Sequence, residues 1–207
     1  MRMGGFQKFS LIDYPGKISC VIFTQGCNLR CPFCHNPELV IPEAFNTPID
    51  EGEVRSFLRM RADELDGVVI TGGEPTLHRD LADFALYVKE LGFALKLDTN
   101  GSSPGMIAGL LDRGLVDYVA MDIKAPENKY ESLAGVKIDT ALIKKSIKVI
   151  RDSGIDHHFR TTLVHEELDS QDIEKIRGMT GGSEYVIQEF ERNGRLVGDF
   201  LLERDVK

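Results

Sequence analysis

The chain has 207 residues, 42% hydrophobic and 28% charged, values typical of one folded domain and not of a disordered chain. Its 33 acidic and 25 basic residues give a net charge of −8, which excludes a generally basic nucleic-acid-binding protein. The longest apolar run, residues 84–88, is too short to span a membrane, and residues 1–6 lack the apolar stretch of a secretory signal. We therefore expect a cytoplasmic protein with one domain over 1–207, whose core covers about 17–190 and whose segments 1–16 and 191–207 are peripheral.

Short apolar segments rich in β-branched residues alternate with amphipathic stretches along the chain. The predicted strands are residues 18–24, 67–71, 93–98, 117–123, 158–164 and 185–190. The predicted helices are 50–61, 81–88 before Gly92, 106–111 before Gly114, 139–152 before Gly154, and 169–177. This alternation indicates βα units, and their parallel strands form either a barrel or a doubly wound sheet.

Polar and charged side chains follow the carboxyl ends of the predicted strands. In either architecture these ends meet at one edge of the sheet, where ligands bind. The segments at these ends are Thr71-Gly72-Gly73-Glu74-Pro75, Asp98-Thr99-Asn100-Gly101, Met121-Asp122-Ile123-Lys124, Arg160-Thr161-Thr162 and Gln188-Glu189. We expect them to surround one site.

All four cysteines, Cys20, Cys27, Cys31 and Cys34, lie in one short segment. A disulfide framework would distribute its cysteines so as to join distant segments, whereas a cluster indicates a metal site. Cys20 lies inside an apolar strand and is expected to be a buried, unliganded side chain. Cys27, Cys31 and Cys34 are therefore the predicted metal ligands.

Two other metal sites fit parts of the same segment. A structural zinc site needs a fourth ligand, which would have to be Cys20 or His35. The run Cys31-Pro32-Phe33-Cys34-His35 also matches the c-type haem attachment pattern. Haem attachment would leave Cys27 without a role, and it belongs to exported proteins. Both alternatives are therefore less favoured than a site formed by three cysteines.

The spacing Cys-x-x-x-Cys-x-x-Cys, with Phe33 before the last cysteine, resembles the signature of the radical S-adenosylmethionine (radical SAM) enzymes. The resemblance implies a [4Fe–4S] cluster held by the three cysteines, with its fourth iron open to S-adenosylmethionine. It also implies that the reduced cluster cleaves this cofactor and that the 5′-deoxyadenosyl radical is the reactive group. No side chain is then needed as a general acid or base.

Other segments extend the resemblance from about residue 5 to about residue 190. The segment around Glu74 is similar to the one that contacts the amino group of the methionine moiety in this family. The resemblance implies that Lys124 pairs with the cofactor carboxylate, and that Asp98 and Asp122 can hold a monovalent cation. A rim of ordinary salt bridges is the alternative for these charged residues. The predicted cofactor-binding residues are Phe33, Gly72, Gly73, Glu74, Asp98, Asn100, Asp122, Lys124, Arg160 and Gln188.

Within the family, the chain is most similar to the glycyl-radical-enzyme activating enzymes, and among them to activators of anaerobic ribonucleoside-triphosphate reductase. The segment Asp13-Tyr14-Pro15-Gly16 matches this branch, so Asp13 is predicted to contact the partner enzyme or, alternatively, to begin a turn. The resemblance implies an incomplete (β/α)6 barrel and a radical placed on such a glycyl-radical enzyme, with a flavodoxin or ferredoxin-type electron donor. No nucleic acid or membrane is expected as a partner.

Two other functions fit the same motifs. A radical SAM enzyme acting on a small molecule, similar to the deazaguanine synthases, would share the cysteines and the rim. An iron–sulfur electron carrier would share the cluster without catalysis. The shortness of the chain leaves little for a lid over a small substrate, while an open barrel could admit a protein loop. This favours a protein substrate.

Overall fold

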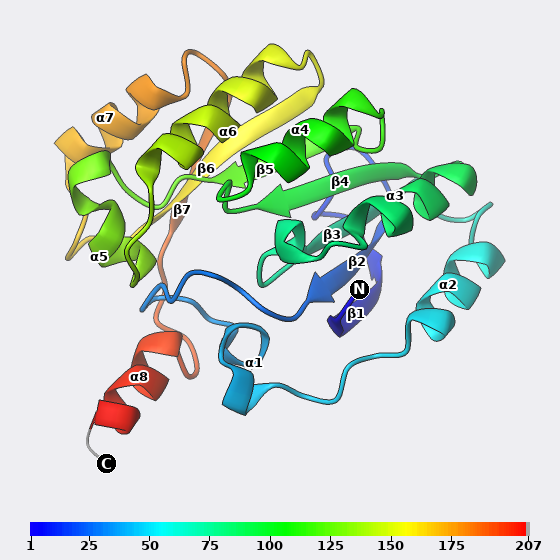
Figure 1. The fold of residues 1–207 in the computed structure, drawn as a ribbon, viewed down its shortest axis with the longest axis horizontal. Helices are drawn as coiled ribbons and strands as arrows, with labels where there is room; N and C mark the ends of the chain where they lie inside the picture. Colours follow the sequence, from blue (N-terminus) through cyan, green and yellow to red (C-terminus); the bar gives the residue numbers. More distant parts are fainter. Residues whose placement is uncertain (206–207) are drawn as a thin grey trace.

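Seven strands form one sheet in chain order in the computed structural model, which describes residues 1–205 (Figure 1). They are β1 Met3–Ser10, β2 Ser19–Thr24, β3 Gly67–Gly72, β4 Ala94–Thr99, β5 Tyr118–Asp122, β6 Asp156–Leu163 and β7 Tyr185–Glu189. Strands β2 to β7 are parallel and are the six that the sequence predicts, whereas β1 is an additional strand antiparallel to β2. The predicted α/β fold and its partial barrel are confirmed.

Helices connect the parallel strands, and Figure 1 shows α3, α4, α6 and α7 in succession along one side of the sheet. The five predicted helices are confirmed, and Gly92 and Gly114, with φ of 86° and 63°, follow two of them as expected. The shorter elements α1, α5 and the 3-10 turns have too few residues for periodicity to reveal them. The helices are α1 Pro37–Val40, α2 Glu51–Met60, α3 Leu81–Glu90, α4 Pro104–Asp112, α5 Tyr130–Ala134, α6 Thr140–Asp152, α7 Ser170–Met179 and α8 Val197–Asp205.

The two faces of the sheet differ in chemistry because neighbouring residues of a strand point to opposite faces. Leu95 and Leu97 of β4 are buried in the main hydrophobic core together with Phe84 and Ile107 of the covering helices. The intervening Lys96 and the following Asp98 belong to the other face, inside the curve of the sheet. The helices thus cover the apolar face of β4, and its inner face carries the charged Lys96 and Asp98 next to a small apolar cluster that includes Val21 and Val69.

The N-terminal segment is part of the sheet, contrary to the expectation that residues 1–16 are peripheral. Met3 is fully buried, and Tyr14 is 3% exposed, packed against Val21 and Val69. The segment around β1 contains two glycines and several polar residues, so its sequence has little of the pattern of a strand. Pairing with β2 is what gives it this structure.

The C-terminal segment also differs from its expected peripheral position. The amide of Val197, the first residue of α8, donates to the Cys34 carbonyl (3.0 Å), and Gly198 donates to the Pro32 carbonyl (2.9 Å). Val197 is fully buried. Helix α8 therefore packs directly on the loop that carries the cysteines. None of the described helices is long and apolar enough to cross a membrane.

Candidate functional site

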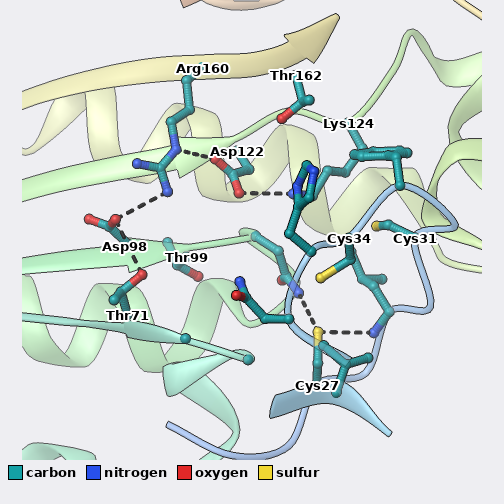
Figure 2. A pocket seen from close by; sticks show the side chains of 18 residues that line it. Cys27, Cys31, Cys34, Thr71, Asp98, Thr99, Asp122, Lys124, Arg160 and Thr162 are labelled. Carbon is teal, nitrogen blue, oxygen red and sulfur yellow. Dashed lines mark hydrogen bonds and ion pairs between the residues drawn. The ribbon is translucent and has the colours of Figure 1, made fainter. Parts of the chain in front are cut away.

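A pocket of about 230 Å³ lies at the carboxyl ends of the parallel strands, next to the cysteine loop, residues 25–36 (Figure 2). The loop follows β2, and, apart from Val40 of α1, the other lining groups come from the ends of β3, β4, β5 and β6. The prediction that these strand ends converge is confirmed, except for β7. The lining residues are Cys27, Leu29, Cys31, Phe33, Cys34, His35, Asn36, Val40, Thr71, Gly72, Gly73, Asp98, Thr99, Asn100, Asp122, Lys124, Arg160 and Thr162.

Three of the four cysteines line this pocket as free thiols, and Cys20 does not. Burial raises the pKa of the Cys27 thiol to about 12 and that of Cys31 to about 11, so both are protonated at neutral pH. Among the described residues, no three His, Cys, Asp or Glu side chains meet as ligands of a single metal ion would. The thiols face one cavity from successive positions of one loop, and a metal bound there must displace their protons.

Polar contacts to a sulfur atom are already present in the pocket. The Leu29 amide donates to Cys27 Sγ (3.4 Å), and the side-chain amide of Asn100 donates to the same atom (3.9 Å). Hydrogen bonds to thiolate sulfurs tune the potential of iron–sulfur sites. Asn100 also donates to Asn28 Oδ1 (3.0 Å), which holds the end of β4 against the cysteine loop.

Backbone contacts hold the cysteine loop from both sides. The Gly26 amide donates to the Leu39 carbonyl (2.8 Å), and the Arg30 amide donates to the Ala134 carbonyl (2.8 Å). The Arg30 guanidinium donates to the Cys27 carbonyl (2.7 Å), which closes a turn within the loop. With α8 on the remaining side, the cysteines are preorganised by the fold and not only by their spacing.

Five charged side chains of alternating sign form a row on the inner face of β4, β5 and β6, which we call the charge ladder. Lys96 pairs with Asp98, Asp98 with Arg160 (3.1 Å), Arg160 with Asp122, and Asp122 with Lys124 (2.8 Å). Burial alone would raise the pKa of Asp122, but Arg160 and Lys124 hold it far below its usual range. Burial would lower the pKa of Lys124, and Asp122 raises it instead, so this ammonium group stays charged.

Two predicted cofactor-binding residues lie outside the pocket. Glu74 is fully buried, and its carboxylate accepts hydrogen bonds from the Thr76 amide (3.0 Å), the Thr99 hydroxyl (2.7 Å) and the Asn100 amide (2.6 Å). Through these contacts Glu74 joins the end of β3 to the end of β4. Its side chain does not line the pocket. Gln188 is exposed on the edge strand β7 and does not line the pocket, although Phe190, just after β7, packs against the lining residues Phe33 and His35.

Asp13 lies at the opposite end of the sheet from the cysteine loop. It follows β1 and precedes β2, near the pair Ser10 and Ser19 that marks the amino end of β2. Its carboxylate accepts a hydrogen bond from the Ser10 hydroxyl (2.5 Å), whereas the turn over Pro15 and Gly16 begins at Tyr14, whose carbonyl accepts from the Lys17 amide (3.2 Å). A partner that contacts Asp13 must therefore reach that end of the barrel.

Thr71 and Thr162 were expected at the strand ends but not among the cofactor-binding residues, and Lys96, which lies outside the pocket lining, was not predicted, although a signal for it exists. Thr71 donates to Asp98 Oδ2 (3.3 Å), and Thr162 lines the pocket next to the strand position of Arg160. Lys96, which stands two residues before Asp98, extends the charge ladder. Because strand residues two apart share a face, the pattern Leu-Lys-Leu-Asp in β4 indicates a charged inner face.

The Radical SAM superfamily pattern matches residues 21–178 of the chain. A protein of Methanocaldococcus jannaschii, named as a candidate glycyl-radical enzyme activating enzyme, is 38% identical over 195 residues, which cover 91% of this chain and 80% of that protein. The pyruvate formate-lyase-activating enzyme of Clostridium pasteurianum is 29% identical over 179 residues, covering 83% of this chain and 72% of that enzyme.

A solved structure has the same fold. SuiB of Streptococcus suis, bound to S-adenosylmethionine, aligns with a TM-score of 0.69 at 17% identity. The alignment covers 86% of this chain and 42% of SuiB, so the chain spans less than half of that protein. At this identity the similarity concerns the arrangement of strands and helices.

Proposed function

The chain belongs to the Radical SAM superfamily, and we propose that it is an activating enzyme that generates a glycyl radical on a partner enzyme. Membership of the family implies a [4Fe–4S] cluster and S-adenosylmethionine as cofactors. When bound and reduced, the cluster would supply the one electron that breaks a carbon–sulfur bond of S-adenosylmethionine, giving methionine and a 5′-deoxyadenosyl radical able to take a hydrogen atom from the substrate. The protein residues bind and orient these groups.

The observation that carries the proposal is that Cys27, Cys31 and Cys34 face the same pocket as the charge ladder. The three thiols fit a cluster with one iron open to a ligand, because no fourth cysteine lines the pocket. Cys20 is fully buried in β2 and takes no part. Asn100, whose side-chain amide reaches Cys27 Sγ, lines the same pocket.

The charge of the pocket suits the methionine end of S-adenosylmethionine. The ladder has three cationic and two anionic side chains, so it has one surplus positive charge. We assign this surplus to Lys124, whose ammonium lines the pocket and can pair with the cofactor carboxylate. Phe33, Gly72 and Gly73 line the same pocket and complete the proposed cofactor site.

A glycine residue of a protein suits this chemistry as the source of the hydrogen atom. The radical left on its α-carbon is delocalised onto both flanking amides, and the lack of a Cβ allows close approach of the loop. The relatives named as activating enzymes support this class of substrate. We propose an anaerobic ribonucleoside-triphosphate reductase as the partner and a flavodoxin or ferredoxin as the electron donor, with the reaction in the cytoplasm.

The class of enzyme is tested by incubating the anaerobically reconstituted protein with S-adenosylmethionine and a reductant. We expect 5′-deoxyadenosine and methionine to form, and neither to form when the reductant is omitted. Chromatography of the quenched mixture measures both products. If the reduced protein forms no 5′-deoxyadenosine, it is an electron carrier and the proposed activity is wrong.

A further inference from the structure

The end of the cysteine loop that carries Cys34 is held by the C-terminal segment, residues 190–205. The Val197 amide donates to the Cys34 carbonyl (3.0 Å), and the Gly198 amide donates to the Pro32 carbonyl (2.9 Å). A Cβ at Gly198 would lie 2.9 Å from the Pro32 carbonyl oxygen, so the backbone of α8 is in close contact with the backbone of the loop. These contacts fix the last cysteine relative to α8.

The start of the C-terminal segment contacts the same end of the loop through side chains. The ring centroid of Phe190 lies 6.3 Å from that of Phe33 and 5.4 Å from that of His35. His35 Nε2 is hydrogen-bonded to the Glu191 carbonyl oxygen (2.8 Å), and the ring nitrogen is the donor because a carbonyl only accepts. Two separate parts of the C-terminal segment therefore hold the loop.

Apolar side chains of α8 and of the residues around α1 form a small cluster next to the loop, which we call the α8 cluster. Figure 1 shows α8 beside α1 and apart from the helices that cover the sheet. Cys27 and Cys34 pack against the α8 cluster, and both also line the pocket. These two cysteines therefore face the pocket on one side and apolar side chains on another. The members of the cluster are Val40, Ile41, Ala44, Val197, Phe200 and Leu201.

We propose that the C-terminal segment positions Cys34 and keeps water from the α8 side of the bound cluster, so that it lowers the reduction potential of the cluster. The presence of a cluster rests on the proposed function. Reduction adds one negative charge, which water stabilises more than apolar side chains do. An apolar cover therefore makes the reduced cluster a stronger electron donor.

Val197 and Gly198 are positioning residues in this proposal. They act through the backbone of the loop and not on the reacting atoms. A helix that only stabilised the fold would change the unfolding midpoint of the chain without changing the potential of the cluster. The reactivity of Cys34 and the potential therefore separate the two roles.

The first test uses the cluster-free chain and measures the alkylation of each thiol by iodoacetamide with mass spectrometry. Gly198→Val brings a side chain against the Pro32 carbonyl and should lift α8 from the loop. Alkylation of Cys34 should become at least about tenfold faster because the loop opens more often, while Cys20, fully buried in β2, should keep its rate. Gly178→Val in α7 is the matched control, because a Cβ there would meet no atom within 4 Å.

The second test measures the reduction midpoint potential of the reconstituted protein, without S-adenosylmethionine, by a titration followed with electron paramagnetic resonance. The midpoint of Gly198→Val should be more positive than those of the wild type and Gly178→Val, because water reaches the cluster. Phe200→Ala truncates the α8 cluster and leaves both backbone hydrogen bonds of α8 in place. It should shift the midpoint in the same direction, with a smaller change in the alkylation of Cys34.

Two results would overturn the inference. One is alkylation of Cys34 in Gly198→Val at the wild-type rate, and the other is an unchanged or more negative midpoint in both variants. If Cys20 reacts faster by as much as Cys34, Gly198→Val has unfolded generally, and the midpoint of Phe200→Ala then decides. If the wild type binds no cluster, the proposed function fails, and the alkylation of the cluster-free chain still decides whether α8 positions Cys34.

Discussion

Alanine at Cys27, Cys31 or Cys34 is expected to abolish or severely reduce iron binding, with loss of the brown colour of a [4Fe–4S] protein. The reason is that each thiol lines the pocket and no other cysteine can replace it, because Cys20 is fully buried in β2. The measurement is the iron content and visible absorption of each variant after anaerobic reconstitution. Cys20→Ala is the control and should keep both.

The comparison between Cys20 and the other three cysteines separates the possible metal sites. Iron content that falls as far in Cys20→Ala as in the other variants would mean that all four cysteines are ligands. The site would then be a fully ligated electron carrier or a zinc site, with no iron open to a cofactor. The free energy of unfolding of Cys20→Ala should decrease moderately, because a small buried side chain is truncated.

Gly73→Ala is expected to disrupt the site as strongly as loss of a cysteine. A Cβ at Gly73 would lie 2.1 Å from the Gly26 carbonyl oxygen and 3.0 Å from that of Leu39. Both contacts are with backbone, and Gly26 belongs to the cysteine loop, so the clash can be relieved only by moving that loop away from β3. Iron content should fall, and stability should decrease by about 1–3 kcal/mol or more. Iron analysis and urea unfolding of the cluster-free chain measure the two effects.

Gly109→Ala provides the matched control for that substitution. Gly109 lies within α4, and a Cβ there would meet no atom within 4 Å. Alanine is favoured over glycine inside a helix, so this variant should keep its iron and gain roughly 0.5–1 kcal/mol of stability. Wild-type iron content and stability in Gly73→Ala would contradict the close contact between β3 and the cysteine loop.

The parallel strands and main helices could be predicted because their signal is local. Leu95 and Leu97, two residues apart, mark the face of β4 that meets the helices, and the glycines after α3 and α4 mark their ends. Pairing partners and surface contacts depend on residues far apart in the chain. Strand β1 and helix α8 were missed for this reason, since each is defined mainly by what it packs against.

The candidate site shows the same division between local and distant information. Cys27, Cys31 and Cys34 could be found from spacing, and the carboxyl ends of the strands from the βα pattern. The environment of Glu74 could not, because its three hydrogen-bond partners come from the following turn and from the end of β4. The bridge between Arg160 and Asp98 joins β6 to β4 and follows only from the register of the sheet.

Electron paramagnetic resonance of the partner enzyme tests the proposed function most directly. The reduced protein, S-adenosylmethionine and an anaerobic ribonucleoside-triphosphate reductase are mixed anaerobically and frozen. We predict the doublet of a glycyl radical, which disappears when the glycine that carries the radical is replaced by alanine. Accumulation of 5′-deoxyadenosine without a radical on any glycyl-radical enzyme tested would contradict the activating role and indicate a small-molecule substrate.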